Sequence, residues 1–218
     1  MWNRGRPERA LLSGTSILDK KERVDRMNSR FKKIIVGLGG EGWEPIEFIF
    51  DYDSTIARVP IDWPLERSKF RDYFNEMVPE LHLPVGMRVD EMEAAVIQQT
   101  DLDHQIVFGY REILESSLDG QHEPIPLVVE LVQSLGIQPN VRLFIVSNNL
   151  EGTVRSGLRQ LQLLEFFTCI YGVDTVGLPK PFTKAADMLN SEHQVNIENS
   201  VFFGDSPATD GLFCQELG

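Results

Sequence analysis

Cysteine is scarce in this 218-residue chain, which contains only Cys169 and Cys214. Their spacing is weak for a metal site and no second pair exists for a disulfide framework, so we expect a reducing compartment. Long apolar runs are also absent: no stretch approaches the roughly 18 residues of a membrane-spanning helix, and the N-terminus lacks the apolar core of a secretory signal. We therefore expect a cytoplasmic protein with no membrane partner, while organellar targeting by the N-terminus stays open.

Basic residues are outnumbered, with 21 Lys and Arg against 33 Asp and Glu and a net charge of −12. This balance argues against duplex nucleic acid as a partner, because binding a phosphate backbone needs a basic surface. Residues 1–33 are the exception, with ten basic and four acidic residues, so the remaining 185 residues carry −18. We interpret residues 1–45 as a basic N-terminal extension and connector. Its role is open between a targeting segment, a contact arm for an acidic partner and a solvated extension.

A glycine-rich stretch at residues 37–42 has the Gly-x-Gly-x-x-Gly spacing of dinucleotide-binding turns. That turn requires a helix immediately afterwards, with an acidic residue about 20 positions further on. Here Trp43-Glu44-Pro45 and an apolar run follow at once, which leaves no room for the helix. We therefore expect a connector and no nucleotide cofactor.

Short apolar runs alternate with amphipathic stretches from residue 47 to residue 217. Four runs have strand length: Glu47–Phe50, Val141–Val146, Phe167–Tyr171 and Ser200–Phe203. Four stretches have helical spacing of apolar residues: Leu127–Leu135, Gly152–Leu164, Thr183–Asn190 and Asp210–Leu217. This alternation predicts an α/β fold with a Rossmann-like, three-layer core around a parallel sheet. Such sheets bind ligands beyond the carboxyl ends of their strands.

The alternation is interrupted once, between Pro60 and about Pro126, where we find no clear strand. Three segments of this insertion have an amphipathic helical pattern: Pro64–Met77, Met87–Gln99 and Asp103–Leu118. We therefore predict a core of residues 46–59 and 127–218, with a small helical cap of residues 60–126.

Polar residues follow three of the four predicted strands directly. Asp51 and Asp53 end the first run, where a divalent cation could offset the repulsion between them; a turn or capping pair is the alternative. Ser147 and Asn148 end the second run, as an anion seat at a helix start or as ordinary N-cap residues. Asp205 follows the last run.

The two remaining candidate groups lie in loops. Lys180 stands between Pro179 and Pro181, which could fix the direction of its ammonium group, although single lysines are usually solvated. Asp210 is a second acid five residues after Asp205, in a segment that could equally be a glycine turn with capping residues. Each signal is modest alone, and the case depends on their combination.

Together these motifs resemble the haloacid dehalogenase superfamily, whose pattern is Asp-x-Asp-x-Thr after a strand, a strand ending in Ser or Thr, a Lys, and a strand with Gly-Asp and a further acid. The matching residues here, in this order, are Asp51, Asp53, Thr55, Ser147, Lys180, Asp205 and Asp210. The resemblance spans about residues 46–218. The insertion after the first motif is similar to the helical cap of the phosphoglycolate phosphatase and β-phosphoglucomutase branch, and Ile61-Asp62-Trp63-Pro64 is a weaker match to phosphatases of that branch.

The resemblance implies a magnesium-dependent phosphatase in which Asp51 is the nucleophile and Asp53 the general acid and base. It implies further that Asp51, the Asp53 backbone carbonyl and Asp205 hold Mg²⁺. Ser147, Asn148 and Lys180 would bind the phosphoryl group, and Thr55 and Asp210 would support the site. The implied substrate is a small phosphorylated metabolite, and phosphorylated sugars, phosphoglycolate and nucleoside monophosphates stay open.

Two other functions fit the same residues. A phosphomutase of this fold would keep all four motifs, and a binding or regulatory protein could keep the fold with little turnover. The sequence ends at Gly218, soon after the fourth motif, as a fragment or truncated product would. We therefore expect Ser200–Phe203 to be an exposed edge strand.

Overall fold

A four-stranded parallel sheet organises the part of the chain that the structure describes. The structure is a computed structural model that describes residues 47–217, so the predicted N-terminal extension and the glycine-rich stretch at 37–42 lie outside the described residues. The strands are β1 (Glu47–Phe50), β4 (Arg142–Val146), β5 (Phe167–Tyr171) and β6 (Ser200–Phe203), in the order β5-β4-β1-β6. The predicted parallel α/β fold is confirmed, and β6 lies at an edge of this sheet as expected.

Strand β1 lies inside the sheet, paired in parallel on both sides. Phe48 is opposite Leu143 on β4 and Val201 on β6, and the register continues to Phe50. All four residues of β1 are buried, as expected for a parallel strand covered on both faces. The Asp51 backbone N–H, immediately after the strand, donates to the Phe203 carbonyl at 2.8 Å. The first candidate residue therefore starts from a central, well-anchored position.

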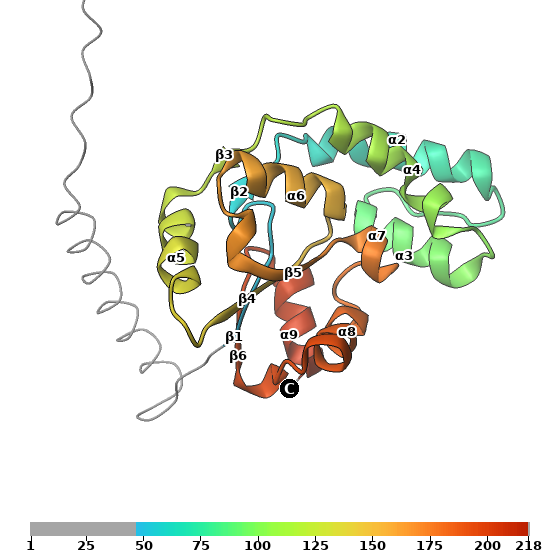
Figure 1. Cartoon of the computed structure of the whole chain (residues 1–218). Helices are drawn as coiled ribbons and strands as arrows, with labels where there is room; N and C mark the ends of the chain where they lie inside the picture. Colours follow the sequence, from blue (N-terminus) through green and yellow to red (C-terminus); the bar gives the residue numbers. More distant parts are fainter. Residues whose placement is uncertain (1–46, 218) are drawn as a thin grey trace, which may run out of the picture. The chain divides into compact units, whose positions relative to one another are not determined.

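Helices cover both faces of the sheet. On one face Ile49, Phe144 and Val146 pack in one apolar cluster with Leu189 of α8 (Lys184–His193) and Phe213 of α9 (Leu212–Leu217). Figure 1 shows α5 (Pro126–Gly136) on the opposite side of the strands from α8 and α9. The remaining helices near the strand ends are α6 (Glu151–Gln160), α7 (Val173–Val176) and the 3-10 turns Leu164–Phe166 and Ile197–Asn199.

Some element ends differ from the predicted ones. Helix α6 stops at Gln160 and not at Leu164, and Gln162 adopts a φ of 58°, which a continuing right-handed helix does not allow. The predicted helix from Asp210 begins instead with a π-helical turn, Pro207–Gly211, before α9. The expectation of no strand between Pro60 and Pro126 was wrong: β3 (Glu123–Pro124) pairs antiparallel with β2 (Ala57–Arg58).

The inserted segment between β2 and β3 is helical, as predicted. It comprises α2 (Trp63–Met77), α3 (Val89–Gln99) and α4 (His104–Ser116), which group together in Figure 1. Asp62 caps α2 by accepting the Leu65 N–H at 3.2 Å. The apolar faces of the three helices form one buried cluster that also includes Leu150 and Val173 from outside the insertion. None of the helices within residues 47–217 has the length and apolar character needed to cross a membrane.

Candidate functional site

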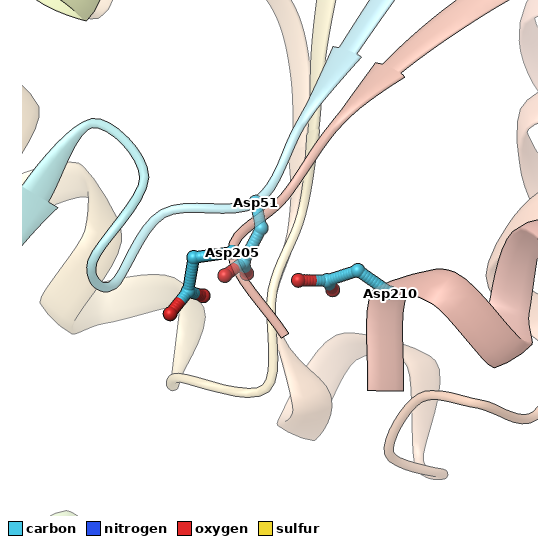
Figure 2. A group of neighbouring side chains, drawn as sticks. All are labelled: Asp51, Asp205 and Asp210. Atoms are coloured by element: carbon cyan, nitrogen blue, oxygen red, sulfur yellow. The ribbon is translucent and has the colours of Figure 1, made fainter. Parts of the chain in front are cut away.

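Three carboxylates converge at the carboxyl ends of β1 and β6. Asp51 follows β1, Asp205 follows β6, and Asp210 lies in the π-helical turn with its side chain directed toward Asp51 (Figure 2). One oxygen from each lies within 4.8 Å of the others. Asp51 and Asp210 are buried, whereas Asp205 is exposed. The register of the two parallel strands explains this meeting, because Phe50 and Phe203 are partners in the sheet.

Lys180 enters the same site from the loop between α7 and α8. Its Nζ donates to Asp51 Oδ1 at 2.8 Å and to Asp210 Oδ1 at 2.6 Å, and its side chain is 3% exposed. Asn148 anchors the backbone of this lysine: its Oδ1 accepts the Lys180 N–H at 2.7 Å and its Nδ2 donates to the Lys180 carbonyl at 3.3 Å. The ammonium group therefore lies between two carboxylates, and the loop after β4 fixes the backbone of the lysine.

The close packing of these charges shifts their pKa values. Burial raises the pKa of Asp51, with the Lys180 ammonium opposing the rise. Burial alone would lower the pKa of Lys180, but the carboxylates of Asp51 and Asp210 outweigh it and raise that pKa, so the side chain stays charged. Burial and the two neighbouring carboxylates raise the pKa of Asp205. A site with more carboxylates than cations favours the binding of a further cation.

Asp53 lies beside this group, in the turn between β1 and β2. Its Oδ1 accepts the Val59 N–H at 2.9 Å, and its Oδ2 accepts the Trp63 indole N–H at 3.4 Å. Burial raises the pKa of Asp53 to about 6, against the lowering effect of these two donors. Its carboxyl group can therefore hold or release a proton near neutral pH. The indole of Trp63, the first residue of α2, connects this acid to the inserted helices.

The loop after β4 presents Ser147 and two asparagines. The Ser147 N–H donates to the Tyr171 carbonyl at 3.0 Å, which extends the pairing of β4 with β5 by one residue. The Ser147 hydroxyl and the Asn149 side-chain carbonyl lie 3.2 Å apart, and the Asn149 N–H donates to the same hydroxyl oxygen at 3.2 Å. The loop is therefore a closed turn that fixes the Ser147 hydroxyl.

A cavity of about 250 Å³ unites most of the predicted residues. Its lining includes Asp51, Asp53, Ser147, Asn148, Lys180 and Asp205. Thr55 and Asp210 do not line it. Thr55 is buried in the turn after Asp53, and its hydroxyl oxygen has no hydrogen-bond partner among the described residues.

The inserted helices supply a wall that sequence reasoning missed. Trp63 and three arginines of the inserted segment line the cavity: Arg67 of α2, Arg88 immediately before α3 and Arg111 of α4. Trp63 lies in the Ile61–Pro64 stretch already singled out, but nothing distinguishes the arginines in the sequence from solvated helix charges. Arg111 is buried, and its Nε and Nη2 donate to both oxygens of Glu93 at 2.8 and 2.9 Å. Arg88 likewise pairs with Asp90, which also lines the cavity, so two of the three arginines are held by acidic partners.

The donor set suits a hard divalent cation. Carboxylate oxygens are the ligands that Mg²⁺ prefers, and three converge here within 4.8 Å. The side chain of Asp53 is not one of the three, and the metal role predicted for this residue concerns its backbone carbonyl. Thiolate or imidazole groups do not join the three carboxylates among the described residues, which favours Mg²⁺ over softer metals.

Comparison with known proteins identifies a family. The sequence model of the haloacid dehalogenase-like hydrolase family matches residues 48–218 of this chain. A search of curated proteins gave no significant match. A structure from Bacteroides fragilis, described as a haloacid dehalogenase-like hydrolase, has a TM-score of 0.55 at 20% identity, over 80% of this chain and 85% of that one.

Two further solved structures share the fold at low identity. The HAD-hydrolase YfnB from Bacillus subtilis, bound to magnesium, has a TM-score of 0.52 at 21% identity, over 80% of this chain and 84% of that one. A Lactobacillus plantarum protein described as a phosphoglycolate phosphatase has a TM-score of 0.50 at 18% identity, over 78% and 82% of the two chains. Identities this low bear on the fold alone.

Proposed function

Because the chain belongs to the haloacid dehalogenase-like hydrolase family, we propose that it is a magnesium-dependent phosphatase that hydrolyses a small phosphate monoester. One observation carries the proposal: the Lys180 ammonium bridges the carboxylates of Asp51 and Asp210 at 2.8 and 2.6 Å, beside a cavity that Asp53 and Asp205 also line. A nucleophile, a proton donor and a cation for the phosphoryl group thus share one small space.

In the first proposed step, an Asp51 oxygen attacks phosphorus and the bond from phosphorus to the ester oxygen breaks. Asp53 donates its proton to the departing oxygen, so the alcohol leaves neutral and an aspartyl-phosphate remains. The pKa of about 6 supports this role, because a carboxyl group with that value can still carry a proton near neutral pH. Covalent catalysis divides one difficult displacement into two easier ones.

In the second step, Asp53 as carboxylate takes a proton from water, and the resulting hydroxide oxygen bonds to phosphorus. The bond between phosphorus and Asp51 then breaks, which releases inorganic phosphate and restores the nucleophile. Lys180, the Ser147 hydroxyl and Asn148 would bind the phosphoryl oxygens throughout. Their positions are fixed before substrate arrives, which is the condition for electrostatic stabilisation of the transition state.

Mg²⁺ would be held by Asp51, Asp205 and the backbone carbonyl of Asp53, with Asp210 supporting Lys180. When bound, the ion offsets the negative charge that builds up as a carboxylate approaches a phosphate. Burial and then the carboxylates of Asp51 and Asp210 raise the pKa of Asp205, and a bound divalent cation would offset the second of these effects.

The cavity and its helical wall support a small substrate. A volume of about 250 Å³ lies below the range of about 300–1,000 Å³ that drug-sized ligands occupy. We also propose the domain division predicted above, with residues 60–126 as a cap over a core of residues 46–59 and 127–218. The proposed substrate class is a small phosphorylated metabolite.

Phosphate release from an aryl phosphate and from a panel of small phosphorylated metabolites tests the proposal. Wild-type protein is assayed with Mg²⁺ or with EDTA, beside Asp51→Asn and the control Asp187→Asn, which changes an exposed aspartate on α8. We expect turnover that needs Mg²⁺, that Asp51→Asn abolishes and that Asp187→Asn retains. Turnover in EDTA or in Asp51→Asn would contradict the mechanism. Folded protein without any turnover would instead favour a phosphomutase or a binding protein.

A further inference from the structure

Glu115, in the last turn of α4, joins the inserted helices to the loop that carries Ser147. The residue is 1% exposed. Its Oε1 accepts from Arg111 Nη1 at 3.1 Å and from the Asn149 side-chain amide at 3.2 Å. Its Oε2 accepts the backbone N–H of Leu150 at 3.0 Å. The buried carboxylate of Glu115 therefore accepts from an arginine of its own helix and from two successive residues of the loop after β4.

The contacts continue from this loop to the groups proposed to bind phosphate. The Asn149 amide nitrogen donates to Glu115, and its amide oxygen accepts from the Ser147 hydroxyl, both at 3.2 Å. The preceding residue, Asn148, holds both backbone groups of Lys180. The turn of residues 147–150 is thus tied to Glu115 on one side and to the Lys180 loop on the other.

Charge makes Glu115 an unusual choice for this position. A buried carboxylate is costly unless it is paired, and here the pairing needs a buried arginine that Glu93 also binds. A neutral acceptor would satisfy the two loop donors without that arrangement. The carboxylate, by contrast, makes the loop contacts charge-assisted, and such bonds are about twice as strong as neutral ones.

We propose that Glu115 is a positioning residue for phosphate binding, which fixes the turn of residues 147–150 against the inserted helices. This inference rests on the proposed phosphatase function. Glu115 does not touch the phosphoryl group; it acts through Asn149 and the Leu150 N–H, which hold the Ser147 hydroxyl in place. Glu115 then adds a polar link between the phosphate-binding loop and the inserted helices to the apolar contact that Leu150 makes with them.

The test compares Glu115→Ala with Glu93→Gln in the full chain. Glu93 belongs to the same buried ion-pair cluster but makes no contact with the loop, so both variants weaken the cluster. We expect Glu115→Ala to weaken inhibition by inorganic phosphate at least tenfold, with kcat/KM falling as much or more. Glu93→Gln should change phosphate inhibition less than threefold at a comparable loss in Tm. Glu115→Gln, which keeps one acceptor, should give an intermediate result.

Two kinetic results would overturn the inference. One is phosphate inhibition that Glu115→Ala leaves unchanged, and the other is a loss that follows Tm alike in both variants. Amide hydrogen exchange at Asn149 and Leu150 provides a reading that needs no turnover. Protection at these amides should fall in Glu115→Ala and persist in Glu93→Gln, and retained protection in Glu115→Ala refutes the positioning role. A wild-type protein without turnover would therefore count against the phosphatase proposal, while the exchange experiment still decides the role of Glu115.

Discussion

Replacing Arg111 with methionine should destabilise the protein more than replacing any surface arginine. The guanidinium group makes three hydrogen bonds to buried carboxylates, at 2.8 and 2.9 Å to Glu93 and 3.1 Å to Glu115. It also lies 5.2 Å from the centre of the Trp63 ring. In Arg111→Met two buried carboxylates lose their common cation, and breaking a buried pair in this way costs about 3–5 kcal/mol. At roughly 2–4 °C per kcal/mol for a chain of this size, Tm should fall by about 6–20 °C.

The measurement is urea and thermal unfolding of wild type, Arg111→Met and the control Arg155→Met. Arg155 also pairs with a glutamate four residues away, Glu151, at 2.5 Å, but its side chain is 39% exposed. Exposed pairs of this kind contribute about 0.3–0.5 kcal/mol. The control should therefore differ little from wild type.

A pH series separates lost charge pairing from lost packing. Burial already raises the pKa of Glu93, against the effect of Arg111, so without the arginine this pKa should rise further. A carboxyl group whose pKa is higher in the folded than in the unfolded state favours folding at low pH, and the advantage is lost as the pH rises. The difference between Arg111→Met and wild type should thus be smaller at pH 5 than at pH 8. A loss below about 1 kcal/mol, or one independent of pH, would refute the reasoning.

Three further outcomes are expected. Gly157→Ala should lower the free energy of unfolding by about 1–3 kcal/mol, because the added Cβ would lie 1.7 Å from the Tyr52 hydroxyl and 2.1 Å from His122 Nδ1. In the same denaturation assay Gly152→Ala should be neutral or stabilising, because its added Cβ would meet no atom within 4 Å. Burial lowers the pKa of His122 from 6.5, so as the pH drops below 6.5 the unfolded state binds a proton first and stability should fall. The fall should be less steep in His122→Gln, and equal slopes of stability against pH would exclude this histidine as the cause. In a thermal-shift assay, Mg²⁺ at 100 times its Kd should stabilise wild type by about 2.7 kcal/mol, and Asp205→Asn should lose most of that stabilisation. An unchanged stabilisation in Asp205→Asn would exclude this residue as a metal ligand.

The sheet was predictable because its strands are short apolar runs, three of which end abruptly at polar residues. Three predicted strands match β1, β5 and β6 at both ends, and the fourth differs from β4 by one residue. The pair of β2 and β3 was not predictable, since two residues carry no periodicity and their partners lie far apart in the chain. Apolar spacing also cannot distinguish the π-helical turn Pro207–Gly211 from an α-helix, because five residues make little more than one turn and the only buried residue among them is Asp210.

The candidate site divides along the same line. Residues at strand ends could be identified because the parallel sheet brings those ends to one edge, and the cavity lining includes Asp51, Ser147 and Asp205. The contribution of the inserted helices could not be identified. Arg111 and Glu115 have the spacing of an ordinary exposed helix pair, and only the packing of α3 against α4, which brings Glu93 to them, shows that they are buried.

The place of β1 inside the sheet has a consequence for the order of folding. Its two neighbours come from late in the chain: Glu47 meets Arg142 across 95 residues and Ser200 across 153. Contacts between residues so distant in sequence form slowly, because the chain loses the entropy of a large loop before any pairing compensates. During synthesis Asp51 emerges early but has no neighbouring strand until β4 is made, and no Asp205 beside it until β6 follows. Enzymatic turnover would therefore appear only at the end of folding, which makes it a direct reporter of the completed sheet.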